Sequence, residues 1–147
     1  MTISQANVMT KITTTRDIDT CHMIRKLVFV VEQGIGLEED IDGLDDTATH
    51  LLATDNGSPV GTARLLEKGT TGKIGRLAVL KAHRGKGIGA AIVRAALAEF
   101  ASRPHLTEAR LGAQIEAVAF YESLGFGQIG DEFVDAGMPH QEMVRPL

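Results

Sequence analysis

The chain has 147 residues, of which 44% are hydrophobic and 23% are charged, and its formal net charge is −4. This length favours one domain with a hydrophobic core of its own. The negative charge gives no reason to expect nucleic acid as a partner, and no apolar run approaches the ~20 residues that a membrane-spanning helix needs. The single cysteine, Cys21, excludes an internal disulfide and favours a reducing compartment, the cytoplasm.

The N-terminal third of the domain is predicted to form a strand and a helix. Residues 1–8 lack a signal-peptide pattern and are expected to form a flexible tail, so that 9–147 make up the single domain. A β-branched run at 11–15 predicts a strand. A helix capped by Asp17 or Asp19 follows and ends before Gly34. Its apolar face comprises Ile18, Cys21, Ile24, Leu27 or Val28, and Val31.

An acidic segment at 38–46 carries six carboxylates. Their spacing fails the EF-hand pattern, so we expect no metal there. The default prediction is a solvated loop, and the functional alternative is a lip that attracts a cationic substrate.

The remaining elements alternate in type along the chain. Apolar runs at 49–54 and 60–66 flank Asn56-Gly57, which predicts a hairpin, although with a loop longer than two residues. A turn at 69–72 leads into a strand at 73–80, so three antiparallel strands follow one another. Then come a helix at 87–102, a strand at 109–113, a helix at 115–124, and strands around 126–133 and 141–144. The order β-α-β-β-β-α-β-α-β-β predicts an α+β domain, with a mixed but mostly antiparallel sheet flanked by helices.

A glycine-rich stretch joins the strand at 73–80 to the next helix and has the features of an anion cradle. It reads Arg84-Gly85-Lys86-Gly87-Ile88-Gly89-Ala90. Glycines admit a close approach of the backbone, and the free N–H groups of a helix start attract phosphate. The stretch formally satisfies G-x-G-x-x-A, which would suggest a dinucleotide oxidoreductase. However, antiparallel strands precede it and the next strand ends in Gln114 rather than an acidic residue. A P-loop pattern is absent.

A third interpretation of the stretch is acyl-CoA binding, and here two motifs resemble a family. Arg84-x-x-Gly87-x-Gly89 resembles the pyrophosphate loop of the GNAT N-acetyltransferases. The later Gln114-x-x-Ala117-x-x-Phe120-Tyr121-x-x-x-Gly125-Phe126 resembles their second cofactor motif. The likeness spans roughly 9–145. More narrowly, Arg25-x-x-Val28-Phe29-Val30-x-Glu32-Gln33, Asp42-Gly43-x-Asp45 and His50 resemble the YjcF-like or ElaA-like branch.

The resemblance implies the GNAT fold and transfer of an acetyl group from acetyl-CoA to a primary amine by direct attack, through a tetrahedral intermediate. The strand residues would bind pantetheine through their main chain, the loop would bind pyrophosphate, and the second motif would complete the site. The implied acetyl-CoA-binding residues are Leu77, Ala78, Val79, Arg84, Gly85, Lys86, Gly87, Ile88, Gly89, Ala90, Gln114 and Phe120.

The resemblance also implies catalytic and acceptor residues. Tyr121, the single tyrosine, stands where the family places the acid that protonates the departing thiolate. The base that takes the amine proton could be Glu32, His50, Glu116 or a water molecule. The acceptor, a small molecule or a peptide, would meet Phe29, Gln33, Arg64 and Arg76. For the two arginines an ion pair with an acidic residue is the alternative.

Two wider expectations accompany this assignment. From the resemblance to the family we expect a homodimer whose subunits meet through the C-terminal strands. The alternative function is a non-catalytic acetyl-CoA-binding sensor or interaction module on the same fold.

Overall fold

The computed structural model describes residues 10–147, and the tail expected at 1–8 lies outside the described residues. The strands are β1 (Thr10–Thr15), β2 (Thr49–Asp55), β3 (Ser58–Lys68), β4 (Thr71–Val79), β5 (Glu108–Gln114), β6 (Gly127–Gln128), β7 (Phe133–Asp135) and β8 (Met138–Pro146). The α-helices are α2 (Ile18–Arg25), α3 (Leu37–Asp40), α4 (Ile88–Ala101) and α5 (Val118–Ser123). A π-helical segment, η1 (Lys26–Glu32), and the 3₁₀ turns η2 (Asp45–Thr47), η3 (Lys81–His83) and η4 (Ile115–Ala117) complete the described elements.

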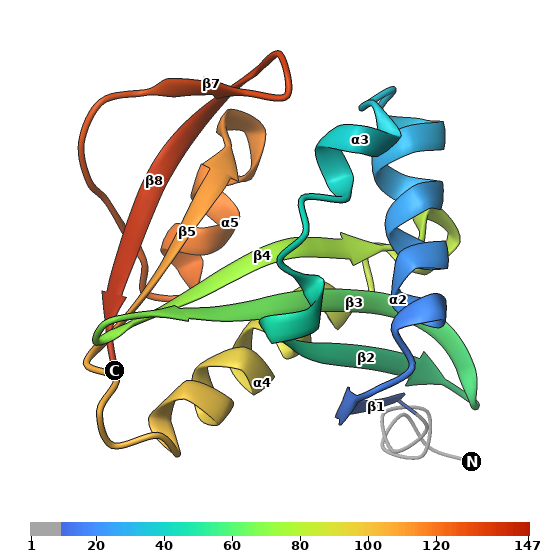
Figure 1. The fold of residues 1–147 in the computed structure, drawn as a ribbon, viewed down its shortest axis with the longest axis horizontal. Coiled ribbons are helices and arrows are strands. Elements are labelled where there is room, and N and C mark those ends of the chain that lie inside the picture. Colours follow the sequence, from blue (N-terminus) through green and yellow to red (C-terminus); the bar gives the residue numbers. More distant parts are fainter. Residues whose placement is uncertain (1–9) are drawn as a thin grey trace.

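The strands form one sheet in the order β1-β2-β3-β4-β5-β8-β6, and β7 pairs with β8. Every pair is antiparallel except β4 with β5, so the predicted mixed, mostly antiparallel sheet is confirmed. The parallel pair is short: residues 71–73 face 108–110, and beyond them β5 and β8 turn away from β4 (Figure 1).

Helices α2 and α4 cover opposite faces of the sheet (Figure 1). On the α4 face, Ile92, Val93 and Phe100 are fully buried against β3 and β4. Strand and helix come very close there, since a Cβ at Gly72 would lie 2.7 Å from the Phe100 ring. On the α2 face a smaller cluster joins Ile24 and Val28 to Ala78 of β4. No helix of the part that the structure describes is long and apolar enough to cross a membrane.

The first helix follows the prediction at its start and departs from it at its end. The side chain of Asp17 accepts a hydrogen bond from Thr20 N–H and caps α2. From Lys26 onward the backbone adopts π-helical bonding, as in the 3.0 Å bond from Gln33 N–H to the Val28 carbonyl. The wider turn leaves Val28 4% exposed and Val31 67% exposed. The expected burial of Val31 is therefore wrong, and Val28 rather than Leu27 is buried.

Two turns and strands also differ from the prediction. The β2–β3 connection contains only Asn56 and Gly57, with φ of 52° and 81°, so it is a two-residue hairpin turn and not the longer loop expected. At the C-terminal end, the single strand expected at 126–133 is replaced by the short strands β6 and β7, which pair with different parts of β8.

Candidate active site

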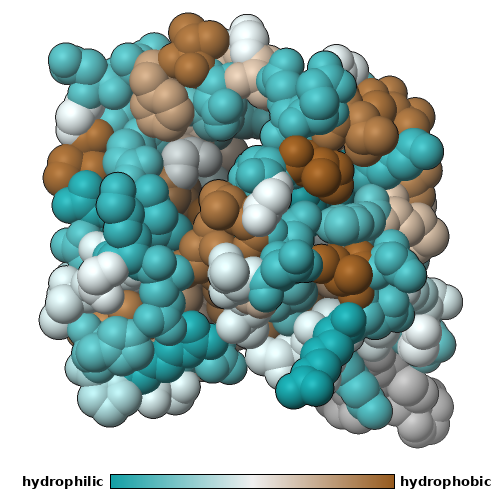
Figure 2. Space-filling model, viewed as in Figure 1, coloured by the Kyte–Doolittle hydropathy of each residue, from teal (hydrophilic) through white to brown (hydrophobic). Residues whose placement is uncertain are grey.

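A cavity of about 1130 Å³ lies where β4 and β5 separate. It appears as the hollow near the centre of the face seen in Figure 2. Its walls come from η1, β4, the loop before α4, β5, α5 and the β7–β8 hairpin. Sixteen of the 20 residues predicted for the site line this cavity, and Glu32, His50, Lys86 and Glu116 do not.

The strand β4 offers unpaired main-chain groups to this cavity. Beyond Lys73 its described pairs are with β3 alone, so the edge that faces β5 is open through Leu77, Ala78 and Val79. A bulge helps to turn the strand aside: Thr62 and Arg64, two residues apart on β3, face Ala78 and Gly75, three residues apart on β4. Arg76 lies within this bulge with φ of 52°. An open strand edge of this kind can bind an extended ligand as an added strand.

The glycine loop closes one end of the cavity. Gly85 and Gly87 have φ of 79° and 81°, and a Cβ at either would meet no atom within 4 Å, so the backbone is accessible there. Gly87 is the N-cap of α4, whose first N–H groups lack partners within the helix. At Gly89 a Cβ would lie 3.6 Å from the Phe120 ring. These features fit a pyrophosphate group. Lys86 borders a separate, smaller cavity instead.

Arg84 is held by the last residue of β4 and by η1. Its Nε donates to the Val79 carbonyl at 3.0 Å, and its two terminal nitrogens donate to the Glu32 carboxylate at 2.6 and 2.7 Å. The hydrogen bonds from Arg84 lower the pKa of Glu32. A carboxylate that is engaged in this way and lies outside the cavity is a poor base for the acceptor amine.

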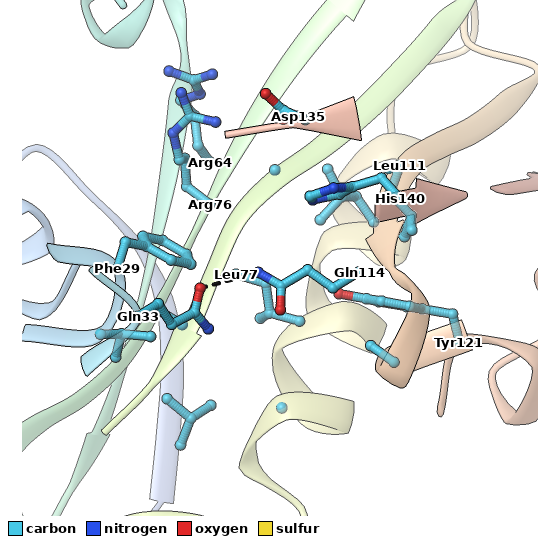
Figure 3. A pocket seen from close by; sticks show the side chains of 18 of the residues that line it. Phe29, Gln33, Arg64, Arg76, Leu77, Leu111, Gln114, Tyr121, Asp135 and His140 are labelled. Carbon is cyan, nitrogen blue, oxygen red and sulfur yellow. Dashed lines mark hydrogen bonds between the residues drawn. The ribbon is translucent and has the colours of Figure 1, made fainter. Parts of the chain in front are cut away.

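Tyr121 points its hydroxyl group into the cavity beside Gln114 (Figure 3). Its ring is fixed by edge-to-face contacts with Phe120 and Phe126, whose centroids lie 5.0 and 6.1 Å away. Burial raises the pKa of Tyr121 to about 12, so the phenol stays protonated at neutral pH and can donate. Gln114 Nε2 donates to Gln33 Oε1 at 3.0 Å and thereby connects the two walls of the cavity (Figure 3).

The acidic segment is not the solvated loop that the sequence predicts. Asp40 and Asp45 are buried, and together with the half-exposed Asp42 they bind three arginines of α2, β3 and β4. Arg25, which is 1% exposed, donates to Asp40 at 3.1 Å and to Asp45 at 2.8 Å. The remaining pairs are Arg64 with Asp42 (2.7 Å) and Asp45 (3.3 Å), and Arg76 with Asp40 (3.2 Å) and Asp42 (3.1 Å). We call these six residues the arginine–aspartate cluster.

The cluster lowers the pKa values of Asp42 and Asp45. Hydrogen bonds from Arg64 outweigh burial and lower the pKa of Asp42 to about 2. Burial alone would raise the pKa of Asp45, but hydrogen bonds from Arg25 and His22 outweigh it and hold that pKa well below its usual range. Arg64 and Arg76 also line the cavity, so these two arginines form the ion pairs and contribute to the cavity wall at the same time.

His50 does not face the gap, contrary to the expectation. It lies on β2, which β3 separates from β4, and it does not line the cavity. Its Nε2 lies 2.9 Å from the Asp45 carbonyl, which can only accept, so this nitrogen donates and anchors the acidic segment. Glu116 is exposed and likewise does not line the cavity.

The sequence prediction missed the opposite wall of the cavity. There the β7–β8 hairpin presents Asp135, His140 and Glu142. The expected last strand began at residue 141, one position after His140, whereas β8 begins at Met138. Recognising the hairpin turn at Ala136-Gly137, with φ of 51° and 73°, would have extended the strand to include it.

Comparison with known proteins agrees with this geometry. Residues 26–147 match the model of the acetyltransferase (GNAT) domain. YjcF of Bacillus subtilis, described as an uncharacterized N-acetyltransferase, is 39% identical over 123 residues, which cover 83% of this chain and 87% of YjcF. The structure of Escherichia coli ElaA has 29% identity and a TM-score of 0.82, and the match covers 93% of this chain and 99% of ElaA. An acyl-CoA N-acyltransferase from Pseudomonas aeruginosa has 27% identity and a TM-score of 0.83, over 92% of this chain and 99% of that protein. The chain therefore belongs to the GNAT family of acyl-CoA-dependent N-acetyltransferases, in the branch that includes YjcF and ElaA.

Proposed function

We propose that this protein binds acetyl-CoA in the cavity between β4 and β5 and transfers the acetyl group to a primary amine that is cationic in solution. One observation carries the proposal: the open edge of β4 leads directly to the glycine loop at the start of α4, and Tyr121 faces the same cavity. Main-chain groups for pantetheine, N–H groups for pyrophosphate and a proton donor thus lie in sequence along one surface.

The residues that we propose bind acetyl-CoA fall into two groups, one for the pantetheine arm and one for the pyrophosphate. Leu77, Ala78 and Val79 would hold the pantetheine arm through their main chain, and Gln114 and Phe120 would form the facing wall. The N–H groups of the loop would hold the pyrophosphate, with Arg84 as the nearby cation and Lys86 at its outer side. The loop residues concerned are Gly85, Gly87, Ile88, Gly89 and Ala90.

The proposed chemistry needs no covalent enzyme intermediate. Bound acetyl-CoA supplies a thioester, whose carbonyl carbon the amine attacks directly. The main-chain N–H near Val79 would polarise the thioester carbonyl, as an oxyanion hole does. The Tyr121 hydroxyl would then donate its proton to the departing sulfur. Cys21 is fully buried and burial raises the pKa of its thiol, so we assign it to the core.

Charge at the acceptor end supports a cationic amine. Glu39, Asp135 and Glu142 line the cavity, and the described residues contain no ion-pair partner for them. The arginines nearby, Arg64 and Arg76, are already matched by the carboxylates of the arginine–aspartate cluster. Phe29 of η1 and Gln33, the residue directly after η1, would contact the apolar and polar parts of the acceptor.

Binding and turnover test this proposal separately. Calorimetry with acetyl-CoA, CoA and NAD should detect binding of the first two and not of NAD. Thiol release from acetyl-CoA should then appear with at least one member of a panel of polyamines, amino sugars, amino acids and peptides. Binding of acetyl-CoA with no thiol release across the panel would favour the sensor function, and binding of NAD alone would refute the proposal.

A further inference from the structure

We infer that His140 is the base that takes the proton from the acceptor amine. The inference rests on the proposed function and adds to it a residue that the sequence motifs do not identify. Its starting point is position. His140 on β8 pairs directly with Gln114 on β5, and opposite residues of an antiparallel pair point to the same face. Gln114 reaches across the cavity to Gln33, so His140 faces the cavity as well (Figure 3).

The tautomer of the neutral His140 ring follows from a single hydrogen bond. Its Nδ1 lies 2.8 Å from the Met138 carbonyl oxygen. A carbonyl can only accept, so Nδ1 carries a proton and donates the hydrogen bond, and in the neutral ring Nε2 keeps its lone pair. Within the part of the chain that the structure describes, Nε2 has no hydrogen-bond partner. The ring is therefore held in the tautomer in which the nitrogen that is free to react is a proton acceptor.

The orientation of the ring is also fixed. His140 is 8% exposed, and its ring stacks on Phe133 with centroids 5.6 Å apart and an interplanar angle of 29°. Phe133 lies on β7 and is the direct pairing partner of His140 on β8. A hydrogen bond at one ring nitrogen and a stacked neighbour are the supports that hold an imidazole base in a productive position.

The other histidines are less suited to this role. His50 and His22 bind Asp45 and do not line the cavity. His83 lines the cavity at its other end, in η3 directly before the glycine loop. His105 is exposed and binds Glu67. Of the described histidines, His140 thus combines a position at the acceptor end with a free lone pair.

The proton and electron balance of the step is complete with two side chains. The cationic amine first releases one proton to solvent, which frees the lone pair that forms the C–N bond to the carbonyl carbon. His140 Nε2 then takes the second proton from that nitrogen. The C–S bond breaks, its electron pair leaves with sulfur, and sulfur takes the proton of the Tyr121 hydroxyl. Transfer of one proton from the imidazolium to the tyrosinate, through solvent, restores both residues. The net products are an amide and free thiol.

The charged and titratable groups around His140 set the conditions for a pH measurement. They are Glu142 on the same strand, Asp135 on β7, Tyr121 on α5, and Lys73, Arg64 and Arg76 across the cavity. Because several of them could affect the rate, the pH dependence is interpreted only as a difference between variants.

The test compares His140→Gln with His105→Gln, a matched control at an exposed histidine outside the cavity. The probe is whichever of spermidine, glucosamine and a lysine peptide gives the fastest thiol release with wild-type protein. His140→Gln should lower kcat/KM at least tenfold, towards the ~100-fold effect of a lost general base. It should also make the loss of activity at acid pH less steep, because only the protonation of the amine itself then remains, and leave the Kd for acetyl-CoA unchanged. A fall in kcat/KM of less than tenfold, or an unchanged loss of activity at acid pH, would overturn the inference while leaving the proposed function intact.

A second measurement does not depend on turnover or on the variant folding. Long-range ¹H–¹⁵N correlation spectra of the wild-type protein, assigned through the contact of the His140 ring with Phe133, report which ring nitrogen carries the proton. We expect Nδ1 to be protonated in the neutral His140 ring. Finding Nε2 protonated in the neutral ring instead would overturn the inference, even if no acceptor were found. Absence of thiol release with all three amines would count against the proposed function and not against the assignment of His140.

Discussion

Replacing Asp45 by Asn should destabilise the protein without changing its shape. The carboxylate of Asp45 accepts from Arg25 at 2.8 Å, from His22 at 2.8 Å and from Arg64 at 3.3 Å. The arginine–aspartate cluster contains three guanidinium groups and three carboxylates, so the substitution leaves one buried positive charge in excess. Breaking a buried ion pair on one side costs about 3–5 kcal/mol.

The lower end of that range applies here, because the Asn side chain keeps one oxygen that can accept from Arg25. A loss of about 3 kcal/mol is below the ~5–15 kcal/mol by which domains are usually stable, so the variant should still fold. At this chain length the melting temperature should fall by roughly 6–12 °C. Urea unfolding followed by circular dichroism at pH 7 measures the free energy, and Asp46→Asn, at an exposed neighbouring carboxylate, is the control. The control should change stability by less than about 0.5 kcal/mol.

The same substitution should alter the response to acid. The pKa values of Asp42 and Asp45 are lowered in the folded state, so both contribute stability above the unfolded pKa of ~3.9 and lose it as the pH falls further. The wild type should therefore lose stability between about pH 5 and pH 2, and Asp45→Asn should lose less over that interval. A destabilisation below about 1 kcal/mol at pH 7, or identical acid profiles for the two proteins, would refute this account of the cluster.

Two further predictions concern acetyl-CoA. Tyr121→Phe should lower kcat at least about tenfold with little change in the Kd for acetyl-CoA, because the substitution removes the proton donor and keeps the ring packing. Arg84→Ala should instead raise the Kd for acetyl-CoA about tenfold or more and leave kcat largely unchanged, because it removes a cation beside the glycine loop. Steady-state kinetics and calorimetry separate the two effects, and Arg94→Ala, at an exposed position of α4, serves as a charge-matched control.

The assignments behind these two predictions can each fail. Unchanged turnover in Tyr121→Phe would remove Tyr121 from the mechanism. Equal loss of affinity in Arg84→Ala and Arg94→Ala would mean that net charge, rather than a contact at the loop, governs binding.

Local sequence signals were sufficient for much of the fold. Asn56-Gly57 marks a hairpin, the glycines of 85–89 mark the start of a helix, and Tyr121 follows a second motif; each signal lies within a few neighbouring residues. These signals predicted the antiparallel run of strands before α4 and many of the residues that line the cavity along β4, the glycine loop and α5.

The features that the sequence did not predict depend on contacts between distant residues. Arg76 and Asp42 form an ion pair although they are 34 residues apart, and nothing local distinguishes that aspartate from those of a solvated loop. The π-helical turn at 26–32 changes which residues are buried, because its period differs from the one used to read the helix. His140 is a different case: it was missed because the local turn at Ala136-Gly137 was not recognised, so the last strand was expected to begin one residue too late.

The most direct test of the central claim is thiol release from acetyl-CoA by the wild-type protein across the amine panel, with mass spectrometry of the products. The account predicts release that requires a primary amine and yields that amine with one acetyl group added. A protein that binds acetyl-CoA but releases no thiol above the uncatalysed rate with any amine would contradict it.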